Sequence, residues 1–444
     1  MTPRVERRIA AFVKWEARGR GSLLWDQRVR LEPPFVPFER DVDMAPPVDD
    51  GQFETFGTKF FGWLAGPLNK DAGSEMVLEP ESAAQEIEPL LDESEERVIE
   101  LEIALPQSSS ISRELAERFL SSLQQCRHPI SFEVVGRTNR IAIQIAGRES
   151  DVAQIRRQLE AHFPDVSVTI AGSRLGDIWS DERPSLVFDL GLEKEFMVPL
   201  VTVGSLSHDP LTGIVGAFTD LKDQEIGVLQ ILFESVRQPW SASMLRSVTN
   251  ADGSGFFSNA PDLVSQTRRK TEKPLYATVC RLAVQGENYD RVLEVASGLA
   301  GAVSVVNSPT ANELIPLNND SYDFKLHVSD LLDRRSHRSG MVLNLDELVS
   351  IVHLPNSTVR IPKLVRDAKR TKAPPSIADG NPVLLGENQH AGETRNVTVN
   401  DEHRLRHTHV IGSSGSGKST FLINQIRQDI DRGSGLAVFD PTVI

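Results

Sequence analysis

Residues 406–441 read RHTHVIGSSGSGKSTFLINQIRQDIDRGSGLAVFDP. Inside this stretch, residues 412–420 (GSSGSGKST) fit the pattern G-x-x-x-x-G-K-[ST], with Gly412, Gly417, Lys418 and Ser419 in the defining positions. The apolar residues 409–412 predict a strand that leads into the pattern, and the amphipathic residues 420–433 predict a helix that leaves it. A glycine-rich loop between a strand and a helix N-terminus binds nucleotide phosphates, so the stretch predicts a phosphate-binding loop.

The residue types in this loop match the chemistry of a bound triphosphate. We expect positive φ at Gly412, Gly415 and Gly417, because that conformation lets backbone N–H groups approach phosphate oxygens closely. Lys418 is expected to reach the β- and γ-phosphates, and the Ser419 hydroxyl is expected to ligate Mg²⁺. The predicted cofactors are therefore ATP and Mg²⁺. The predicted binding residues are Gly412, Ser413, Ser414, Gly415, Ser416, Gly417, Lys418, Ser419 and Thr420.

The residues around the loop add a more specific resemblance. A tight turn at residues 433–435 leads into LAVFDP at 436–441, which predicts a second strand parallel to the first. Arg406, His407, the loop and Asp440-Pro441 together resemble the first half of the motor core in the HerA/FtsK superfamily of P-loop ATPases, which includes conjugative type IV secretion DNA-transfer ATPases. Upstream, residues 384–399 resemble the small strand-rich lead-in of such proteins. Residues 345–364 resemble their connector, a helix followed by His-Leu-Pro.

The resemblance implies an ATPase that couples ATP hydrolysis to DNA translocation as a homo-oligomeric ring, expected to be a hexamer. An alternative that keeps the same motor but changes the cargo is a secretion ATPase that exports protein or nucleoprotein. The family pattern continues D-P-[KH]-G-D, whereas Thr442, Val443 and Ile444 follow here. Residues 404–444 are therefore expected to be the truncated start of a RecA-like P-loop domain, without the acid that organises Mg²⁺ for hydrolysis. ATP hydrolysis by this chain is expected to be weak or absent.

The region before the motor stretch predicts α/β and α+β domains. Alternating and helical patterns from residue 97 to residue 172 predict the order β-α-β-β-α-β, that of a ferredoxin-like split βαβ unit. A second α+β domain is expected at 173–330, with strands at 225–235 and 275–284 and a helix at 289–303. The remaining predicted segments are a basic N-terminal segment and acidic linker at 1–96, a connector with a small β-rich lead-in at 331–403, and the truncated P-loop domain at 404–444.

Such scaffolds commonly serve assembly and protein contacts, so a non-enzymatic assembly or partner-binding module is the alternative function. A nucleotide kinase or GTPase is disfavoured, because those families place the loop near the start of a domain.

Composition narrows the possible partners and the compartment. The 444 residues carry a net charge of −14, so contact with DNA must come from local basic stretches such as residues 1–30 and 360–372. Residues 71–96 hold ten acidic residues and no Lys or Arg, which predicts a solvated linker. Two cysteines without C-x-x-C spacing predict a reducing compartment, the cytoplasm. No run approaches the length of a membrane span.

Overall fold

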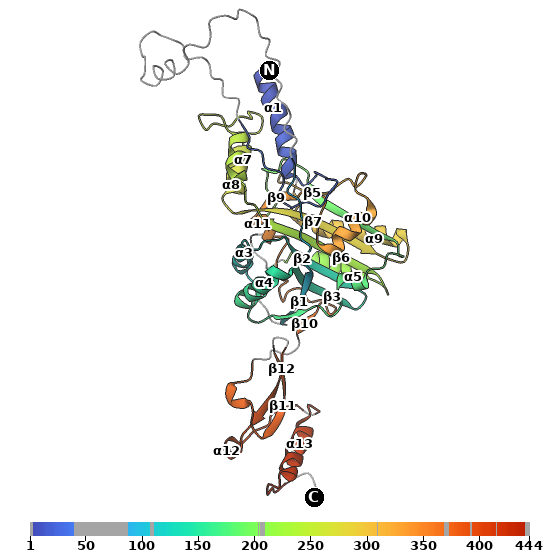
Figure 1. Cartoon of the computed structure of the whole chain (residues 1–444), viewed down its shortest axis with the longest axis vertical. Helices are drawn as coiled ribbons and strands as arrows, with labels where there is room; N and C mark the ends of the chain where they lie inside the picture. Colours follow the sequence, from blue (N-terminus) through green and yellow to red (C-terminus); the bar gives the residue numbers. More distant parts are fainter. Residues whose placement is uncertain are drawn as a thin grey trace, which may run out of the picture.

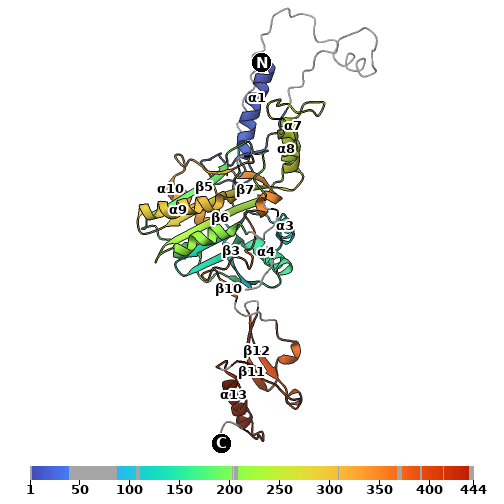
Figure 2. The same ribbon diagram turned by 180° about the vertical axis from the view of Figure 1, so that it is seen from behind.

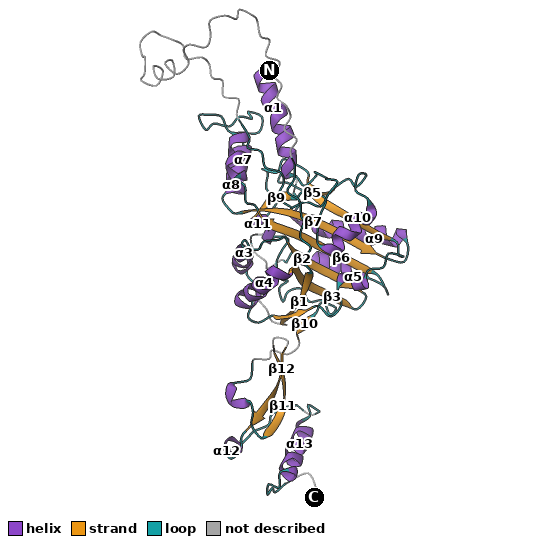
Figure 3. Cartoon of the chain, viewed as in Figure 1, coloured by secondary structure: helices purple, strands orange, loops and turns teal. Residues whose placement is uncertain are grey.

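The computed structural model describes residues 3–39, 88–106, 111–202, 204, 209–308, 310–367, 373–390, 393–413 and 415–439. The chain is mixed α/β, and most of it is built on a ten-stranded, mostly antiparallel sheet (Figures 1 and 3). The strand order is β10-β1-β3-β2-β6-β7-β5-β8, with β4 paired to β1 and β9 paired to β7. A separate two-stranded sheet, β11-β12, lies near the C-terminus.

The strands are β1 (Val98–Pro106), β2 (Ile130–Arg137), β3 (Arg140–Arg148), β4 (Ser167–Ile170), β5 (Ser185–Leu192), β6 (Ile226–Ser235), β7 (Leu275–Gln285), β8 (Leu314–Pro316), β9 (Met341–Asn344), β10 (Arg366–Asp367), β11 (Val383–His390) and β12 (Glu393–Val399). The helices are α1 (Pro3–Glu16), α3 (Arg113–Ser122), α4 (Glu149–His162), α5 (Leu175–Ile178), α6 (Leu211–Ala217), α7 (Trp240–Val248), α8 (Leu263–Thr271), α9 (Tyr289–Val303), α10 (Phe324–Asp333), α11 (Leu345–Val349), α12 (Asp401–Arg404) and α13 (Lys418–Asp431).

The large sheet consists of two halves with the same strand order. In the first half, β1, α3, β2, β3, α4 and β4 follow one another, and the strands pair as β4-β1-β3-β2, all antiparallel. In the second half, β5 to β8 pair as β8-β5-β7-β6, also all antiparallel, with α6 after the first strand and α9 before the last. Residues 98–170 thus hold elements in the order β-α-β-β-α-β, and the second half repeats this order with α7 and α8 inserted.

The two halves meet where β2 pairs with β6 along the whole of β2, from Ile130 opposite Phe233 to Arg137 opposite Ile226. Residues 97–172 and 173–330, expected as two domains, both contribute strands to this one sheet. The physical reason is burial: β2 is buried on both faces, and its free edge would leave backbone groups unpaired without β6.

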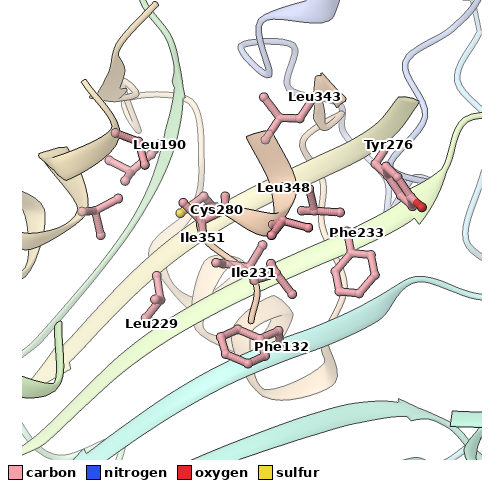
Figure 4. Close-up of a cluster of buried hydrophobic side chains, with 14 of the residues drawn as sticks. Phe132, Leu190, Leu229, Ile231, Phe233, Tyr276, Cys280, Leu343, Leu348 and Ile351 are labelled. Atoms are coloured by element: carbon pink, nitrogen blue, oxygen red, sulfur yellow. The ribbon is translucent and has the colours of Figure 1, made fainter. Parts of the chain in front are cut away.

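One face of the sheet is covered by helices. α4 packs on β1 and β3, and α9 packs on β5 and β7 (Figure 2). Alternate residues of the strands, such as Phe132, Ile231 and Leu190, point into this core (Figure 4). The alternation visible in VIELEIAL at 98–105 has the same cause, since Leu101 and Ile103 lie in this core and Glu100 and Glu102 lie on the other face.

The opposite face carries a row of polar residues that crosses six strands in one register. Each residue lies opposite the next in the register of two neighbouring strands. In order, the row is Glu102, Gln144, Glu133, Gln230, Arg281 and Asp189. The last four are fully buried. Arg281 Nε donates to Asp189 Oδ1 at 2.8 Å, and Arg334, directly after α10, donates to both Glu133 oxygens at 2.9 and 3.0 Å. Paired charges allow this row to be buried.

The basic N-terminal segment packs against the large sheet and its helices, which together form the main body of the chain. Trp15 lies 5.8 Å from Trp240, ring centre to ring centre, and the Gly340 N–H donates to the Leu31 carbonyl at 2.7 Å. Two basic residues of the segment are used inside the fold, because Arg28 pairs with Asp330 and Arg30 pairs with Glu234. Residues 40–87, which hold most of the predicted acidic linker, lie outside the described residues.

The predicted connector at 331–403 divides between two parts of the chain. Its first part belongs to the main body, because β9 pairs with β7, α11 packs on α3 and β10 pairs with β1. Its second part forms the β11–β12 hairpin, at the residues where a strand-rich lead-in was expected. The strands expected at 409–412 and 436–441 are not observed: the described residues 407–413 and 434–439 are irregular. A strand is held by pairing with a neighbour, and neither segment has one among the described residues.

Candidate phosphate-binding loop

The predicted loop lies directly before α13, as the sequence pattern requires. α13 begins at Lys418, and Gly417 caps it with a φ of 89°. Gly415 has a φ of 78°. Both values lie in the left-handed region that glycine favours, so two of the three glycines expected to adopt positive φ do so. Ser414 lies outside the described residues.

Gly412 differs from the expectation, because it is not among the glycines with positive φ. A side chain at this position would instead come close to the side chain of Ser416. A Cβ atom at this position would lie 2.4 Å from the Ser416 hydroxyl oxygen. The loop folds back on itself here, and the Ser416 hydroxyl donates to the Ser413 carbonyl at 2.8 Å.

Lys418 is enclosed by the loop that precedes it. Its Nζ atom donates to the Gly412 carbonyl at 2.7 Å and to the Ser413 carbonyl at 2.8 Å. The side chain is half-buried, whereas its neighbours Gly417 and Ser419 are exposed. The ammonium group is therefore held beside the Gly412 and Ser413 carbonyls. Its third hydrogen remains available to another acceptor.

The rest of the loop is open to solvent. Nothing lies within 4 Å of a Cβ atom placed on Gly415 or on Gly417. Ser419 and Thr420 are exposed in the first turn of α13. The first N–H groups of a helix have no partners within the helix and carry partial positive charge, so this end of α13 suits an anion. Lysine, hydroxyl and backbone N–H groups form the donor set that a triphosphate with Mg²⁺ requires.

The far end of α13 holds an ion-pair cluster that sequence reasoning missed. Arg404 Nη1 and Nη2 donate to the two oxygens of Asp429 at 2.5 and 2.6 Å. Arg432 Nη2 donates to Asp429 Oδ1 at 2.9 Å. The hydrogen bond from Arg404 lowers the pKa of Asp429 to about 2. No local pattern links residues 25 positions apart, so the sequence carried no signal for this pair.

Several basic residues proposed for DNA contact have partners inside the fold. In the basic stretch at 360–372, Lys363 donates to the Thr219 carbonyl and Arg366 donates to the Pro106 carbonyl. Arg360 is exposed, and residues 368–372 lie outside the described residues.

Two further observations concern other kinds of site. Among the described residues, no group of three or more His, Cys, Asp or Glu side chains is placed to hold a metal ion. Across the same part of the chain, the helices are too short or too polar to cross a bilayer.

Comparison with known proteins adds little. Neither a family model nor a curated protein matches the chain. Among solved structures, a variant of berberine bridge enzyme in complex with (S)-reticuline aligns at 11% identity with a TM-score of 0.21. The alignment covers 47% of this chain and 41% of that one. So low a TM-score carries no argument about fold or function.

Proposed function

We propose that residues 412–420 bind the phosphates of ATP, with Ser419 as a ligand of Mg²⁺. The observation that carries the proposal is the loop itself: Gly415 and Gly417 adopt positive φ, Lys418 starts the helix, and the Lys418 ammonium lies at the mouth of the loop. A bound triphosphate would take the open side next to Gly415 and Gly417, where backbone N–H groups and the start of α13 supply donors.

We propose further that the chain belongs to an ATP-dependent DNA translocase of the HerA/FtsK type, in conjugative or type IV secretion DNA transfer. The support is the resemblance of residues 406–441. In this proposal the protein acts in the cytoplasm as a homo-oligomeric ring, a hexamer, on DNA. The main body, with its β-α-β-β-α-β order in each half, corresponds to two ferredoxin-like split βαβ units that recruit partners or substrate.

Binding of radiolabelled nucleotide to the whole chain tests the phosphate site. ATP is expected to bind more tightly than AMP, because Lys418 and the loop act on the β- and γ-phosphates. Mg²⁺ is expected to strengthen ATP binding in the parent chain and to have a weaker effect in Ser419→Ala. Equal affinity for ATP and AMP would contradict the proposal.

The second candidate is a non-enzymatic assembly module. One observation favours it: the main body has a hydrophobic core on one continuous sheet, and no described residue of the loop contributes to that core. Duplex DNA binding measured against salt concentration separates the two functions. A translocase is expected to show a steep negative slope of log affinity against log salt, whereas stable oligomers without DNA affinity would favour the assembly module.

A further inference from the structure

α13 is attached to the β11–β12 hairpin through polar side chains. None of its residues is buried. Gln428 Nε2 and Gln425 Nε2 both donate to the Leu384 carbonyl at 2.9 Å, and the Leu384 N–H donates to Gln428 Oε1 at 2.8 Å. The backbone N–H and carbonyl of one residue of β11, Leu384, are thus both bound by side chains of the helix.

The place of Leu384 in β11 explains why these bonds form there. Within the described part of the chain β11 pairs with β12 alone, so its other edge carries backbone groups that need partners. The pairing register also shifts between Leu384 and Gly386. The amides of Gln425 and Gln428 take the position that a neighbouring strand would otherwise occupy.

A second attachment joins the same end of α13 to the chain that enters the loop. Arg404 ends α12 and precedes the loop, whereas Asp429 lies in the last turn of α13. Their two hydrogen bonds bring both ends of the intervening segment together. Asp429 also accepts a hydrogen bond from Arg432 Nη2. Arg432 Nη1 in turn donates to Asp401 in α12 at 3.3 Å.

We infer that Gln428 and Asp429 are positioning residues for the phosphate-binding loop, and this inference rests on the proposed function. They hold the C-terminal half of α13 against Leu384 and Arg404. Because a helix is stiff, fixing one of its ends also fixes the direction of its other end. The N-terminus of α13 and Lys418 therefore point in one fixed direction. Direction matters because the favourable field of a helix end falls off within its first turn and because phosphate binding depends on aligned donors.

Equilibrium titration of the full chain with ATP and Mg²⁺ tests the inference. Gln428→Ala and Asp429→Asn are each expected to weaken ATP binding about fivefold or more, the usual size of coupling between a supporting contact and a binding site. Arg427→Gln is the matched control, because Arg427 is exposed on the same helix, and it is expected to bind like the parent. Asp429→Glu keeps the carboxylate and is expected to restore most of the affinity.

Hydrogen exchange measured on the same samples separates positioning from simple unfolding. Alanine favours helix, so α13 is expected to remain protected in Gln428→Ala while the Leu384 amide exchanges faster. If the parent binds ATP through Lys418 and both variants bind equally well, the inference fails and the proposed function stands. Loss of protection throughout α13 in both variants would make the two residues structural rather than positioning and would also overturn the inference. If the parent does not bind ATP, the proposed function and the inference fail together.

Discussion

Gly136 and Gly227 face each other across β2 and β6, where the two halves of the large sheet meet. The ring of Phe218, in the short 3-10 helix Phe218–Asp220, lies on both of them. A Cβ atom on Gly136 would be 2.4 Å from the Phe218 ring, and one on Gly227 would be 2.3 Å from it. Phe218 is fully buried, so the junction needs two glycines to make room for one aromatic ring.

Gly227→Ala is therefore expected to lower the free energy of unfolding by about 1–3 kcal/mol, the usual cost of overpacking a core. Urea unfolding measures the effect. Phe218→Leu should relieve the clash, so the double variant is expected to lose less than the sum of the two single variants. Gly298→Ala is the control: Gly298 lies inside α9 with nothing within 4 Å of an added Cβ, and alanine should stabilise the helix by about 0.5–1 kcal/mol. Additive losses in the double variant would contradict the packing described for Phe218.

Removing Arg281 is expected to destabilise the main body strongly. Arg281→Leu leaves the buried Asp189 carboxylate without its closest cation, which typically costs about 3–5 kcal/mol. The double variant of Asp189→Leu with Arg281→Leu removes both charges and is expected to lose less than Arg281→Leu alone. Arg118→Leu, on the exposed face of α3, should change stability by less than about 0.5 kcal/mol. Chemical unfolding of the three variants checks this, and equal losses in all three would refute a role for the buried pair.

The attachment of α13 to Arg404 is expected to depend on pH only in strong acid. The pKa of Asp429 in the folded chain, about 2, lies below the ordinary value of 3.8. A carboxyl group whose pKa is depressed by folding contributes stability that is fully present above its ordinary pKa and is lost as the pH falls through the folded value. The protection factors of the amides in the last turn of α13, which correct the exchange rate for its intrinsic dependence on pH, should therefore stay constant down to about pH 4 and fall between about pH 4 and pH 2. In Asp429→Asn the protection of this last turn should already be lower at neutral pH and show no acid transition, while the rest of α13 stays protected; an unchanged transition would assign it to another group.

Neither cysteine is expected to react quickly with thiol reagents in the folded chain. Burial is the main cause that raises the pKa of Cys280 and of Cys126 to about 12. Since the thiolate is the reactive form, little of it exists at pH 8 in either residue. Labelling with a thiol reagent should proceed slowly in buffer and stoichiometrically in denaturant, with Cys280 the better protected because it is fully buried. Rapid labelling of Cys280 in the folded chain would contradict its place in the core.

Local periodicity predicted the elements of the main body well. The helix expected at 289–303 is α9 with the same bounds, and the alternating residues 98–105 all lie in β1. The joining of two predicted domains into one sheet was not predictable, because it depends on pairing between Ile130–Arg137 and Ile226–Ser235, which local pattern does not encode. For the same reason, Glu133 and Gln230 looked like isolated polar residues in apolar strands, although they lie opposite each other in the sheet.

The sequence predicted the candidate site only in part. The motif located the loop and the start of α13, because glycine and lysine spacing carries the local conformation. It did not reveal the attachment of α13 through Gln428 to Leu384 or through Asp429 to Arg404, since these contacts depend on how the hairpin folds. The strand expected at 409–412 was wrong because strand formation needs a neighbour as well as an apolar sequence.

The most direct test of the proposed function is calorimetric titration of ATP with Mg²⁺ into the whole chain and into Lys418→Ala. The parent is expected to bind one ATP per chain. Lys418→Ala is expected to bind about ten- to a hundredfold more weakly, because it loses charge-assisted hydrogen bonds to the phosphates. Absence of binding to the parent, or equal binding to both chains, would contradict the assignment of residues 412–420 as a nucleotide site.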